Sequence, residues 1–459
     1  MSKLARVTLP DLGRPDRQPE IPLEVYLARM AAVGERMDAA GLDVLAVYGD
    51  REHFANLMYL TGFDPRFEEA LLLIGGGRKL LLVGNECMGY LPDEGLGIET
   101  ELFQEFSLPG QPRGNSRPLR TILSDFGVAR GTPVGCAGWK YFAPPLIEGG
   151  SSAIEIPAYL VDLLRDLTRG EGCVSNAGAI FMDVADGLRI INEPEQIAQY
   201  EYAASVTSTG VLELMRHVKP GAAERDLEKH LDSRGLPLTC HRMVGFGAKA
   251  KRGLASAGDN TAALGDPYTA AFGVVGALTC RAGWVAARLE DLPAADGEFC
   301  MAYAKNYFDV VAAWYAALRI GVTGGEVFAA VEAVRDRALY DFAVNPGHYL
   351  HLEEWTHSPF AAGSGVALRS GMMLQMDIIP ISRGPFCYIN AEDGVALADA
   401  DLRREIAARY PAAWSRIEAR RAFMRGAIGI DLDDCVLPMS NIPAWLPPFV
   451  LDMDQALVL

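Results

Sequence analysis

The chain has 459 residues and a formal net charge of −17, and 50% of its residues are hydrophobic. This length predicts two or three domains, each with enough apolar residues for a core of its own. The acidic charge argues against a phosphate-binding surface, so neither nucleic acid nor an acidic membrane is expected as a partner.

The N-terminal residues, the hydrophobic stretches and the cysteines indicate in which cellular compartment the protein is expected. Residues 1–20 are polar and contain prolines, without the apolar centre of a signal peptide, and no stretch is long and apolar enough for a membrane span. The eight cysteines are scattered without a CxxC spacing, which argues against a disulfide framework or a thiolate zinc site. Reduced thiols and a cytoplasmic location are therefore expected.

The first part of the chain alternates helical and strand patterns. Residues 21–41 carry apolar side chains at helical spacing before a glycine stop, and residues 42–50 have the pattern of a buried strand. Residues 71–83 contain two apolar runs joined by glycines, which predicts a β-hairpin. Further strand and helix patterns follow, and we expect an α/β domain over residues 1–187.

Residues 188–459 are predicted to form a second domain. A long amphipathic helix begins at Pro194, since proline is favoured in a first helical turn, and ends before Pro220. Shorter helical patterns occupy residues 222–235 and 324–342, and residues 374–399 contain two strand patterns joined around residues 382–385. Helices interleaved with antiparallel strands indicate an α+β domain.

Two carboxylates in this last pair of strands are expected to face each other. Antiparallel partners keep a constant sum of residue numbers, and pairing Asp377 with Glu392 centres the turn between Gly384 and Pro385. Like charges directly opposed are destabilising, unless they bind a cation or share a proton for acid/base work. The alternative is a register shifted by a residue or two, with one carboxylate in solvent.

Three of the seven histidines lie close together in NPGHYLHLEEWTHSP, residues 345–359. His348, His351 and His357 lack the i, i+4 spacing of a helical HExxH zinc site. In a strand or loop, each could act as a ligand, a general base or a substrate donor. The alternative for any one of them is a partly buried side chain with a satisfied hydrogen bond.

The order of elements and three motifs resemble the creatinase, aminopeptidase P and prolidase superfamily. GHYLHLEEWTHSP resembles the family's GHGIGxxxHExP, LRSGMMLQMDIIP resembles LxxGMVxxxEP, and YINAEDGVALAD resembles the strand that carries RxEDxxxV. HFANLMYLTGF, residues 53–63, is similar to a stretch of the family's smaller domain. The resemblance implies a C-terminal pita-bread catalytic domain over residues 188–459 and an N-terminal creatinase-type α/β domain.

Family metallopeptidases bind two divalent metals through two aspartates, one histidine and two glutamates. The resemblance places His348 at the histidine, Asp377 at the first glutamate and Glu392 at the second. The aspartate positions fall at Ala271 and near Cys280, so neither carboxylate is present. Because hard divalent cations need such oxygen ligands, we expect no cofactor or, if any, one divalent metal at a degenerate site.

Creatinase, in the same superfamily, has lost its metal ligands and hydrolyses a guanidino C–N bond with histidine and glutamate, and this sequence resembles a relative in that condition. We expect a metal-independent hydrolase that cleaves an amide, amidine or guanidino C–N bond of a small polar substrate. Asp377 and Glu392 would hold a cationic or amidine group, and His348 or His357 would transfer the proton. His351 is a further catalytic candidate.

Arg281 and Tyr388 are candidates for binding a substrate carboxylate, with a surface or structural role as the alternative. Two other functions stay open: a single-metal Xaa-Pro peptidase or lyase, and a non-catalytic peptide-binding pseudoenzyme. The family's site is usually completed by the smaller domain of a second subunit, which implies a homodimer and makes Arg66 a further substrate-binding candidate. The apolar, proline-rich residues 436–459 are expected to pack on the catalytic domain or dimer surface.

Overall fold

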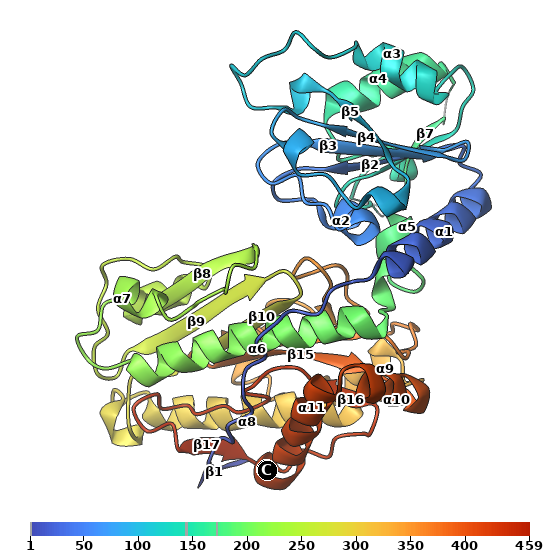
Figure 1. Cartoon of the computed structure of the whole chain (residues 1–459). Helices are drawn as coiled ribbons and strands as arrows, with labels where there is room; N and C mark the ends of the chain where they lie inside the picture. Colours follow the sequence, from blue (N-terminus) through green and yellow to red (C-terminus); the bar gives the residue numbers. More distant parts are fainter. Residues whose placement is uncertain (1, 143–145, 171–172) are drawn as a thin grey trace. The chain divides into compact units, whose positions relative to one another are not determined.

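The computed structural model describes residues 2–142, 146–170 and 173–459. The chain divides into two compact units (Figure 1), Ile21–Ile190 and a second unit that joins residues 2–20 to Ile191–Leu459. Each unit has its own sheets and its own core, and each is described by itself.

The unit Ile21–Ile190 is built on a six-stranded mixed sheet. Its strands follow the order β5 (Glu99–Leu102), β4 (Arg78–Val83), β3 (Ala70–Gly75), β2 (Val44–Gly49), β6 (Val134–Ala137) and β7 (Val174–Asn176). The predicted hairpin is confirmed, because β3 and β4 pair antiparallel around two glycines. The helices are α1 (Leu23–Ala40), α2 (Ala55–Thr61), α3 (Leu119–Phe126), α4 (Ala158–Thr168) and α5 (Ala179–Met182). The expected α/β character of this part is confirmed.

The second unit contains a seven-stranded sheet whose pairings are all antiparallel. The order is β12 (His348–Tyr349), β13 (Met373–Asp377), β15 (Asn390–Leu397), β10 (Ala277–Trp284), β9 (Pro267–Val274) and β8 (Leu238–Phe246), with β16 (Val436–Pro438) also paired to β15. A small two-stranded sheet pairs β11 (Tyr340–Phe342) with β14 (Pro380–Ser382). The chain between β13 and β15 therefore makes a separate pairing instead of the expected tight turn.

Helices pack against this sheet (Figure 1). The predicted long helix is α6 (Pro194–His217), which packs against β9 and β10, while α8 (Gly297–Ala317) contacts β13. α8 was not among the expected helices, because it is apolar on most of its circumference and lacks a clear polar face. The other helices are α7 (Glu224–Glu228), α9 (Gly324–Val334), α10 (Ala400–Arg409) and α11 (Pro411–Phe423).

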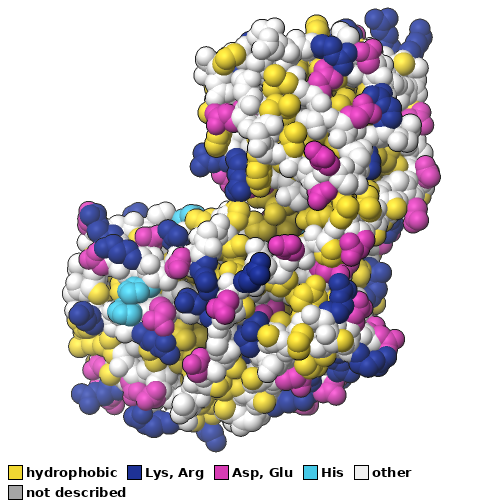
Figure 2. All heavy atoms as spheres, in the orientation of Figure 1, with side chains coloured by type: hydrophobic (Ala, Val, Ile, Leu, Met, Phe, Trp, Pro, Cys, Tyr) yellow, Lys and Arg dark blue, Asp and Glu magenta, His cyan; other side chains and the backbone are white. Residues whose placement is uncertain are grey.

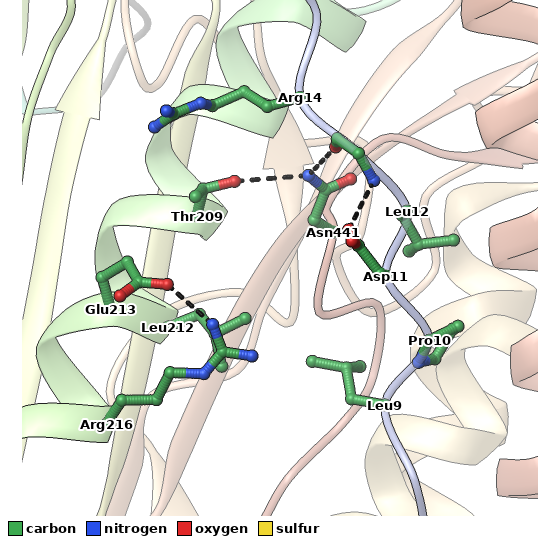
Figure 3. A pocket seen from close by; sticks show the side chains of 11 residues that line it. Leu9, Pro10, Asp11, Leu12, Arg14, Thr209, Leu212, Glu213, Arg216 and Asn441 are labelled. Atoms are coloured by element: carbon green, nitrogen blue, oxygen red, sulfur yellow. Dashed lines mark hydrogen bonds and ion pairs between the residues drawn. The ribbon is translucent and has the colours of Figure 1, made fainter.

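The N-terminal arm, residues 2–20, belongs to the second unit. Its strand β1 (Lys3–Arg6) pairs with β17 (Gln455–Val458) at the C-terminal end of the chain. Farther along the arm, the Asn441 side-chain amide donates to the Gly13 carbonyl at 2.9 Å and lies 3.3 Å from the Thr209 hydroxyl (Figure 3). The expected first domain, residues 1–187, thus differs from the observed unit at its beginning, because a pairing between the two ends of a chain leaves no local signal.

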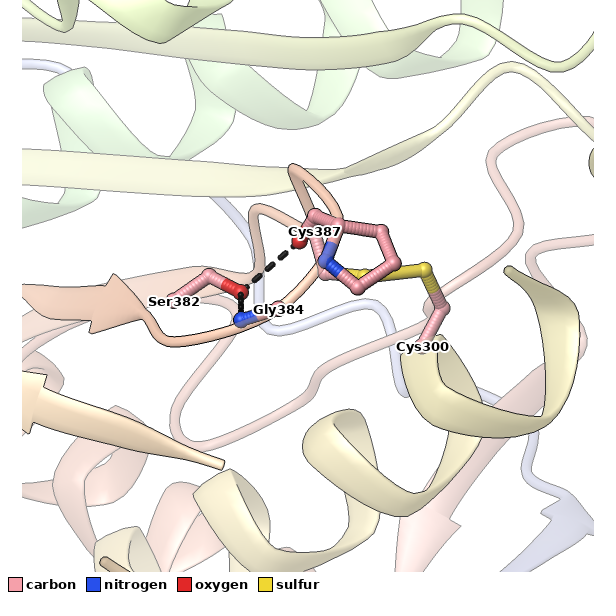
Figure 4. The surroundings of a disulfide bond; sticks show 5 residues. Cys300, Ser382, Gly384 and Cys387 are labelled. Carbon is pink, nitrogen blue, oxygen red and sulfur yellow. Dashed lines mark hydrogen bonds between the residues drawn. A yellow bond between two sulfur atoms is a disulfide. The ribbon is translucent and has the colours of Figure 1, made fainter. Parts of the chain in front are cut away.

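A disulfide joins Cys300 of α8 to Cys387, in the segment just before β15 (Figure 4). The expectation of reduced thiols is wrong for this pair, whereas the other cysteines are free. The two residues lie 87 positions apart, so no short spacing motif marks them. The bond fastens the residue next to Tyr388 to a buried helix.

Two surface features bear on possible partners. Within the described residues, no helix combines the length and the apolarity that crossing a membrane requires. On the face shown in Figure 2, basic and acidic side chains are interspersed.

The C-terminal residues from Val436 onward are mostly buried, which agrees with the expected packing of this apolar segment.

Replacing Cys387 by serine is expected to lower the free energy of unfolding by about 2–4 kcal/mol, because the disulfide closes a long loop and restricts the unfolded chain. Urea unfolding with and without dithiothreitol measures the difference. Cys173→Ser, at a free thiol of the other unit, is the control. Equal stability of the reduced and oxidised protein would contradict this role.

Candidate functional site

One row of side chains crosses the sheet of the second unit. In the observed register Asp377 pairs with Glu392, Glu392 with Cys280, Cys280 with Ala271, and Ala271 with Met243. The predicted opposition of the two carboxylates is confirmed, and the shifted register is excluded. Cross-strand partners share a face of the sheet, so the row has a carboxyl end and an apolar end. Both carboxyl groups are buried, with exposed fractions of 3% and 8%.

The row forms part of the wall of a cavity of about 310 Å³. Its acidic groups are Glu354, Asp377 and Glu392. The rest of the lining comes from three strands and from the segments that connect the elements: Cys240, Met243, Gly253, Leu254, Thr269, Ala271, Leu278, Cys280, Val344, Trp355, Ile379 and Tyr388. The cavity therefore joins a cluster of acidic side chains to a largely apolar wall.

Close packing around Gly347 brings His348 to the acidic end. Trp314 of α8 donates from Nε1 to the Pro346 carbonyl at 2.7 Å, which fixes the chain just before β12. Gly347 has φ 107°, and a Cβ at this position would lie 2.8 Å from the Gln375 carbonyl oxygen. Only glycine accepts both this backbone conformation and this close approach of β12 to β13.

The imidazole of His348 contacts two carboxylates. Its Nε2 lies 3.0 Å from Glu354 Oε1 and 3.7 Å from Asp377 Oδ2, and its Nδ1 lies 3.1 Å from the Tyr349 carbonyl oxygen. A carbonyl oxygen can only accept, so Nδ1 carries the proton of that hydrogen bond. Nε2 is then the atom that can gain or lose a proton at the carboxylates.

Glu354 and Trp355 are site residues that the sequence did not single out. The indole of Trp355 stacks on the His348 ring, with centroids 4.0 Å apart. Both residues belong to the loop between Tyr349 and His357. This loop folds back on itself, so that Tyr349 and His357 form an isolated β-bridge. A loop of this kind has no periodicity from which side-chain directions could be read. The available signal was the presence of two glutamates beside the histidines.

Burial and like charge perturb the paired carboxyl groups. Burial first, and then the charges of Glu392 and Glu354, raise the pKa of Asp377 well above its ordinary value. Burial and the charge of Glu354 raise the pKa of Glu392 to about 8. Removing carboxylates from water disfavours their charged form, and two of them side by side disfavour it further. Both shifts favour the protonated carboxyl groups when no cation is bound, and a bound cation would displace these protons.

A hydrogen-bonded chain orients Glu392. The Asn390 amide donates to Glu392 Oε1 at 3.0 Å, and the hydroxyl of Tyr307 on α8 donates to Asn390 Oδ1 at 2.8 Å. The same hydroxyl accepts the Ala391 N–H at 3.0 Å. Tyr388, on the face of the predicted row, lines the cavity and interacts with Asn390. The sequence analysis did not name Tyr307 as a site residue, because helix α8 that carries it was not predicted.

None of the three histidines of the stretch is among the described residues that line the cavity, and His348 is linked to it through Glu354 and Asp377. His351 is buried and its ring meets the Tyr200 ring of α6 edge-on, with centroids 5.8 Å apart. His357 accepts the Ser358 N–H at Nδ1, at 2.8 Å. The structure thus brings His348 to the carboxylates and places His351 and His357 elsewhere, and a catalytic role for these two stays a prediction.

Arg281 is held on the opposite face of β10. Its neighbour Cys280 faces the cavity, and adjacent side chains alternate along a strand, so the guanidinium points away and pairs with Asp393 at 2.7 Å. It is fully buried and also donates to four backbone carbonyls, those of Cys280, Glu392, Ile442 and Trp445. An arginine has five N–H groups, and none is left here for a substrate carboxylate. The structural alternative therefore replaces the predicted substrate contact.

Arg66 belongs to the unit Ile21–Ile190. Its guanidinium lies 3.4 Å from the Tyr90 hydroxyl and 3.4 Å from the Asp64 carboxylate, and half of its side chain is exposed. Its contribution to the site of a second subunit stays a prediction.

The residues present do not fit a two-metal centre. Ala271 and Cys280, at the expected aspartate positions, face each other across β9 and β10 and form an apolar cluster with Met243 and Leu278. Carboxylate oxygens are missing from this half of the cavity, and oxygen is what hard divalent cations require. The acidic half does fit one ion, because His348, Glu354 and Asp377 each offer a donor atom and these atoms lie within 4.8 Å of one another.

Comparisons with known proteins agree with this fold. Residues 198–400 match the sequence profile of metallopeptidase family M24. The chain carries an M24-type pita-bread domain. A search by sequence of curated proteins found no match.

Solved structures of the same fold cover most of the chain. The prolidase from Pyrococcus horikoshii OT3 is 15% identical, with a TM-score of 0.62 over 81% of this chain and 95% of that one. The Xaa-Pro dipeptidase from Bacillus anthracis is 14% identical, with a TM-score of 0.62 over 82% and 96%. A His243Ala form of Escherichia coli aminopeptidase P is 17% identical, with a TM-score of 0.58 over 86% and 99%. At these identities the likeness establishes the fold alone.

Gly347→Ala is expected to destabilise the protein by about 2–4 kcal/mol, since an alanine here adds a clash with β13 to the strain of a positive φ. Gly321→Ala is the matched control, because Gly321 also has a positive φ (94°) but open space around its Cβ position. Urea unfolding of both variants measures the difference. Equal losses would contradict the close packing that places His348.

Glu392→Gln is expected to stabilise the protein at alkaline pH. The folded state binds the Glu392 proton more tightly than the unfolded state, so wild-type stability falls as the pH rises from about 4.5 towards 8. The variant lacks this loss, so its free energy of unfolding should exceed that of the wild type by about 1 kcal/mol or more at pH 8. At pH 4 the two proteins should be equally stable. Urea unfolding across this pH range tests it, with exposed Glu290→Gln as the control. A constant difference across the range would refute the raised pKa.

Proposed function

We propose that the protein is a creatinase-like hydrolase that cleaves the C–N bond of a small cationic substrate without the family's two-metal centre. The observation that carries the proposal is the contact of buried His348 with Glu354 and Asp377, which together with Glu392 line the acidic half of a cavity whose other half is apolar. A scaffold protein would gain nothing from burying these like charges together, whereas a site that binds a cation would.

The imidazole supplies the proton transfer in this proposal. His348 Nε2 takes a proton from a water molecule as the water oxygen bonds to the substrate carbon. The same atom then gives this proton to the leaving nitrogen as the C–N bond breaks. Glu354, at 3.0 Å, stabilises the imidazolium that exists between the two transfers, and the Tyr349 carbonyl keeps the ring oriented.

The carboxyl pair supplies the binding energy for the cation. An amidinium, guanidinium or ammonium group between Asp377 and Glu392 replaces their protons and restores both charges. Asn390, which accepts a hydrogen bond from Tyr307, donates to the Glu392 carboxyl group and so fixes its orientation. Tyr388 closes the cavity beside it. This arrangement holds the substrate nitrogen near His348, where the proton is needed.

A second candidate function is a single-metal hydrolase or lyase, including a Xaa-Pro peptidase. The three donor atoms of His348, Glu354 and Asp377 favour it. One divalent ion held by these residues would polarise the bond to be cleaved. Metal content separates this candidate from the first one.

Two further proposals concern the state of the protein in the cell. We propose a homodimer in which Arg66 of one copy contributes to the site of the other, and a cytoplasmic location. The dimer rests on the resemblance to the family, and the location rests on the polar residues 1–20 and the free thiols, against which the Cys300–Cys387 disulfide counts. Sedimentation of the purified protein and cell fractionation test them.

His348→Ala is expected to reduce kcat by about 100-fold or more, since the group that moves the proton is lost. The assay measures release of ammonia, amine or urea from a panel of amidines, guanidines, creatine and Xaa-Pro dipeptides. His217→Ala is the control, because His217 is exposed at the C-terminal end of α6 and does not line the cavity.

Metal dependence is tested on the same panel. The proposal predicts full activity after dialysis against a chelator and less than stoichiometric metal in the purified protein. Activity that requires added manganese, iron or zinc would favour the single-metal candidate. A protein that binds peptides but turns over no member of the panel would favour the non-catalytic alternative.

A further inference from the structure

The acidic residues of the cavity wall are not matched by basic ones. Glu354, Asp377 and Glu392 line it, and among the described lining residues none is lysine or arginine. The neighbouring basic residue on β10, Arg281, lies on the far face of the strand with its N–H groups all bound within the protein. Lys251, in the short 3-10 helix Gly247–Arg252, places its ammonium over the Phe386 ring at 4.9 Å and does not line the cavity.

This distribution bears on any substrate that carries a carboxylate. A dipeptide or an amino acid derivative such as creatine brings a carboxylate together with its cation. In a cavity of this size, the carboxylate would lie near three acidic groups or against the apolar wall, and no described residue that lines the cavity within one copy of the chain would pair with it. An anion in this cavity is therefore disfavoured by charge and by desolvation.

The remainder of the lining suits an uncharged apolar body. Leu278, Ile379 and Val344 supply aliphatic surface, and Trp355 supplies an aromatic face next to His348. Trp355 is 37% exposed and lines the cavity, while its indole stacks on the imidazole. Aromatic faces attract organic cations, and the volume matches the small end of ligand pockets, roughly 300–1,000 Å³.

We propose that the cavity selects organic cations that lack a carboxylate: amines, amidines or guanidines with a small apolar substituent. The proposal deepens the proposed function and rests on it for the reaction, but it concerns binding alone. It separates this chain from an enzyme that acts on free dipeptides or on creatine.

Matched ligand pairs test the proposal. Each pair keeps the cation and the side chain and differs in the carboxylate: agmatine and arginine, phenethylamine and phenylalanine, pyrrolidine and proline. Titration calorimetry on the full chain, first freed of metal with a chelator, is expected to show the carboxylate-free member binding about tenfold tighter or more in at least one pair. Asp377→Asn and Glu392→Gln should each weaken that binding about tenfold, because each removes one charge that holds the cation. Glu290→Gln, an exposed glutamate, should leave it unchanged.

Three results would overturn the proposal. They are equal or tighter binding of the amino acids in every pair, no measurable binding of any amine at millimolar concentration, and binding that the two site variants do not change. Repeating the titration with added zinc or manganese distinguishes an organic cation from a metal. If a metal binds stoichiometrically and amines bind only through it, the proposal also fails.

The outcomes of the two proposals can be told apart. A protein that binds agmatine as predicted but hydrolyses nothing would contradict the proposed function and leave the inference standing. A protein that hydrolyses carboxylate-bearing substrates through His348 would support the hydrolase and contradict the inference.

Discussion

The structure of the site depends on the direct opposition of Asp377 and Glu392 across β13 and β15. Burial and mutual repulsion disfavour the ionisation of both carboxyl groups unless a cation lies between them. In the M24 fold, metal ions could meet that demand, but this chain has Ala271 and Cys280 where further carboxylates would be needed. What is left is an acidic half-site with His348 at its edge, whose charge must be balanced by protons, by a single ion or by a substrate.

The surrounding elements serve this half-site in distinct ways. α8 is central, because its Trp314 fixes the chain before His348, its Tyr307 orients Asn390, and its Cys300 fastens the segment that carries Tyr388. On the other face of the sheet, the pair of Arg281 and Asp393 binds the C-terminal segment and keeps positive charge away from the cavity. One helix and one buried ion pair thus determine both the geometry of the site and its charge.

The sequence predicted those parts of the site that follow from strand periodicity. The opposition of Asp377 and Glu392 could be derived from alternation and from the position of the turn, although β14 leaves to pair elsewhere. The same alternation should have excluded Arg281 as a substrate-binding residue, since its neighbour Cys280 was placed in the site and adjacent side chains face opposite sides of a strand. Glu354 could not be placed, because a loop that folds back has no period. The pairing of β1 with β17 and the disulfide of Cys300 join distant residues and have no local signal.

Infrared difference spectroscopy tests the central claim most directly, because protonated and ionised carboxyl groups absorb at different frequencies. Spectra of the metal-free protein are compared with those of Asp377→Asn and Glu392→Gln at neutral pH, before and after addition of agmatine. We expect a protonated carboxyl band in the metal-free wild-type protein. This band should be reduced in Asp377→Asn and in Glu392→Gln, and it should be lost when agmatine is added. Carboxylates that are fully ionised in the empty, metal-free protein would contradict this expectation.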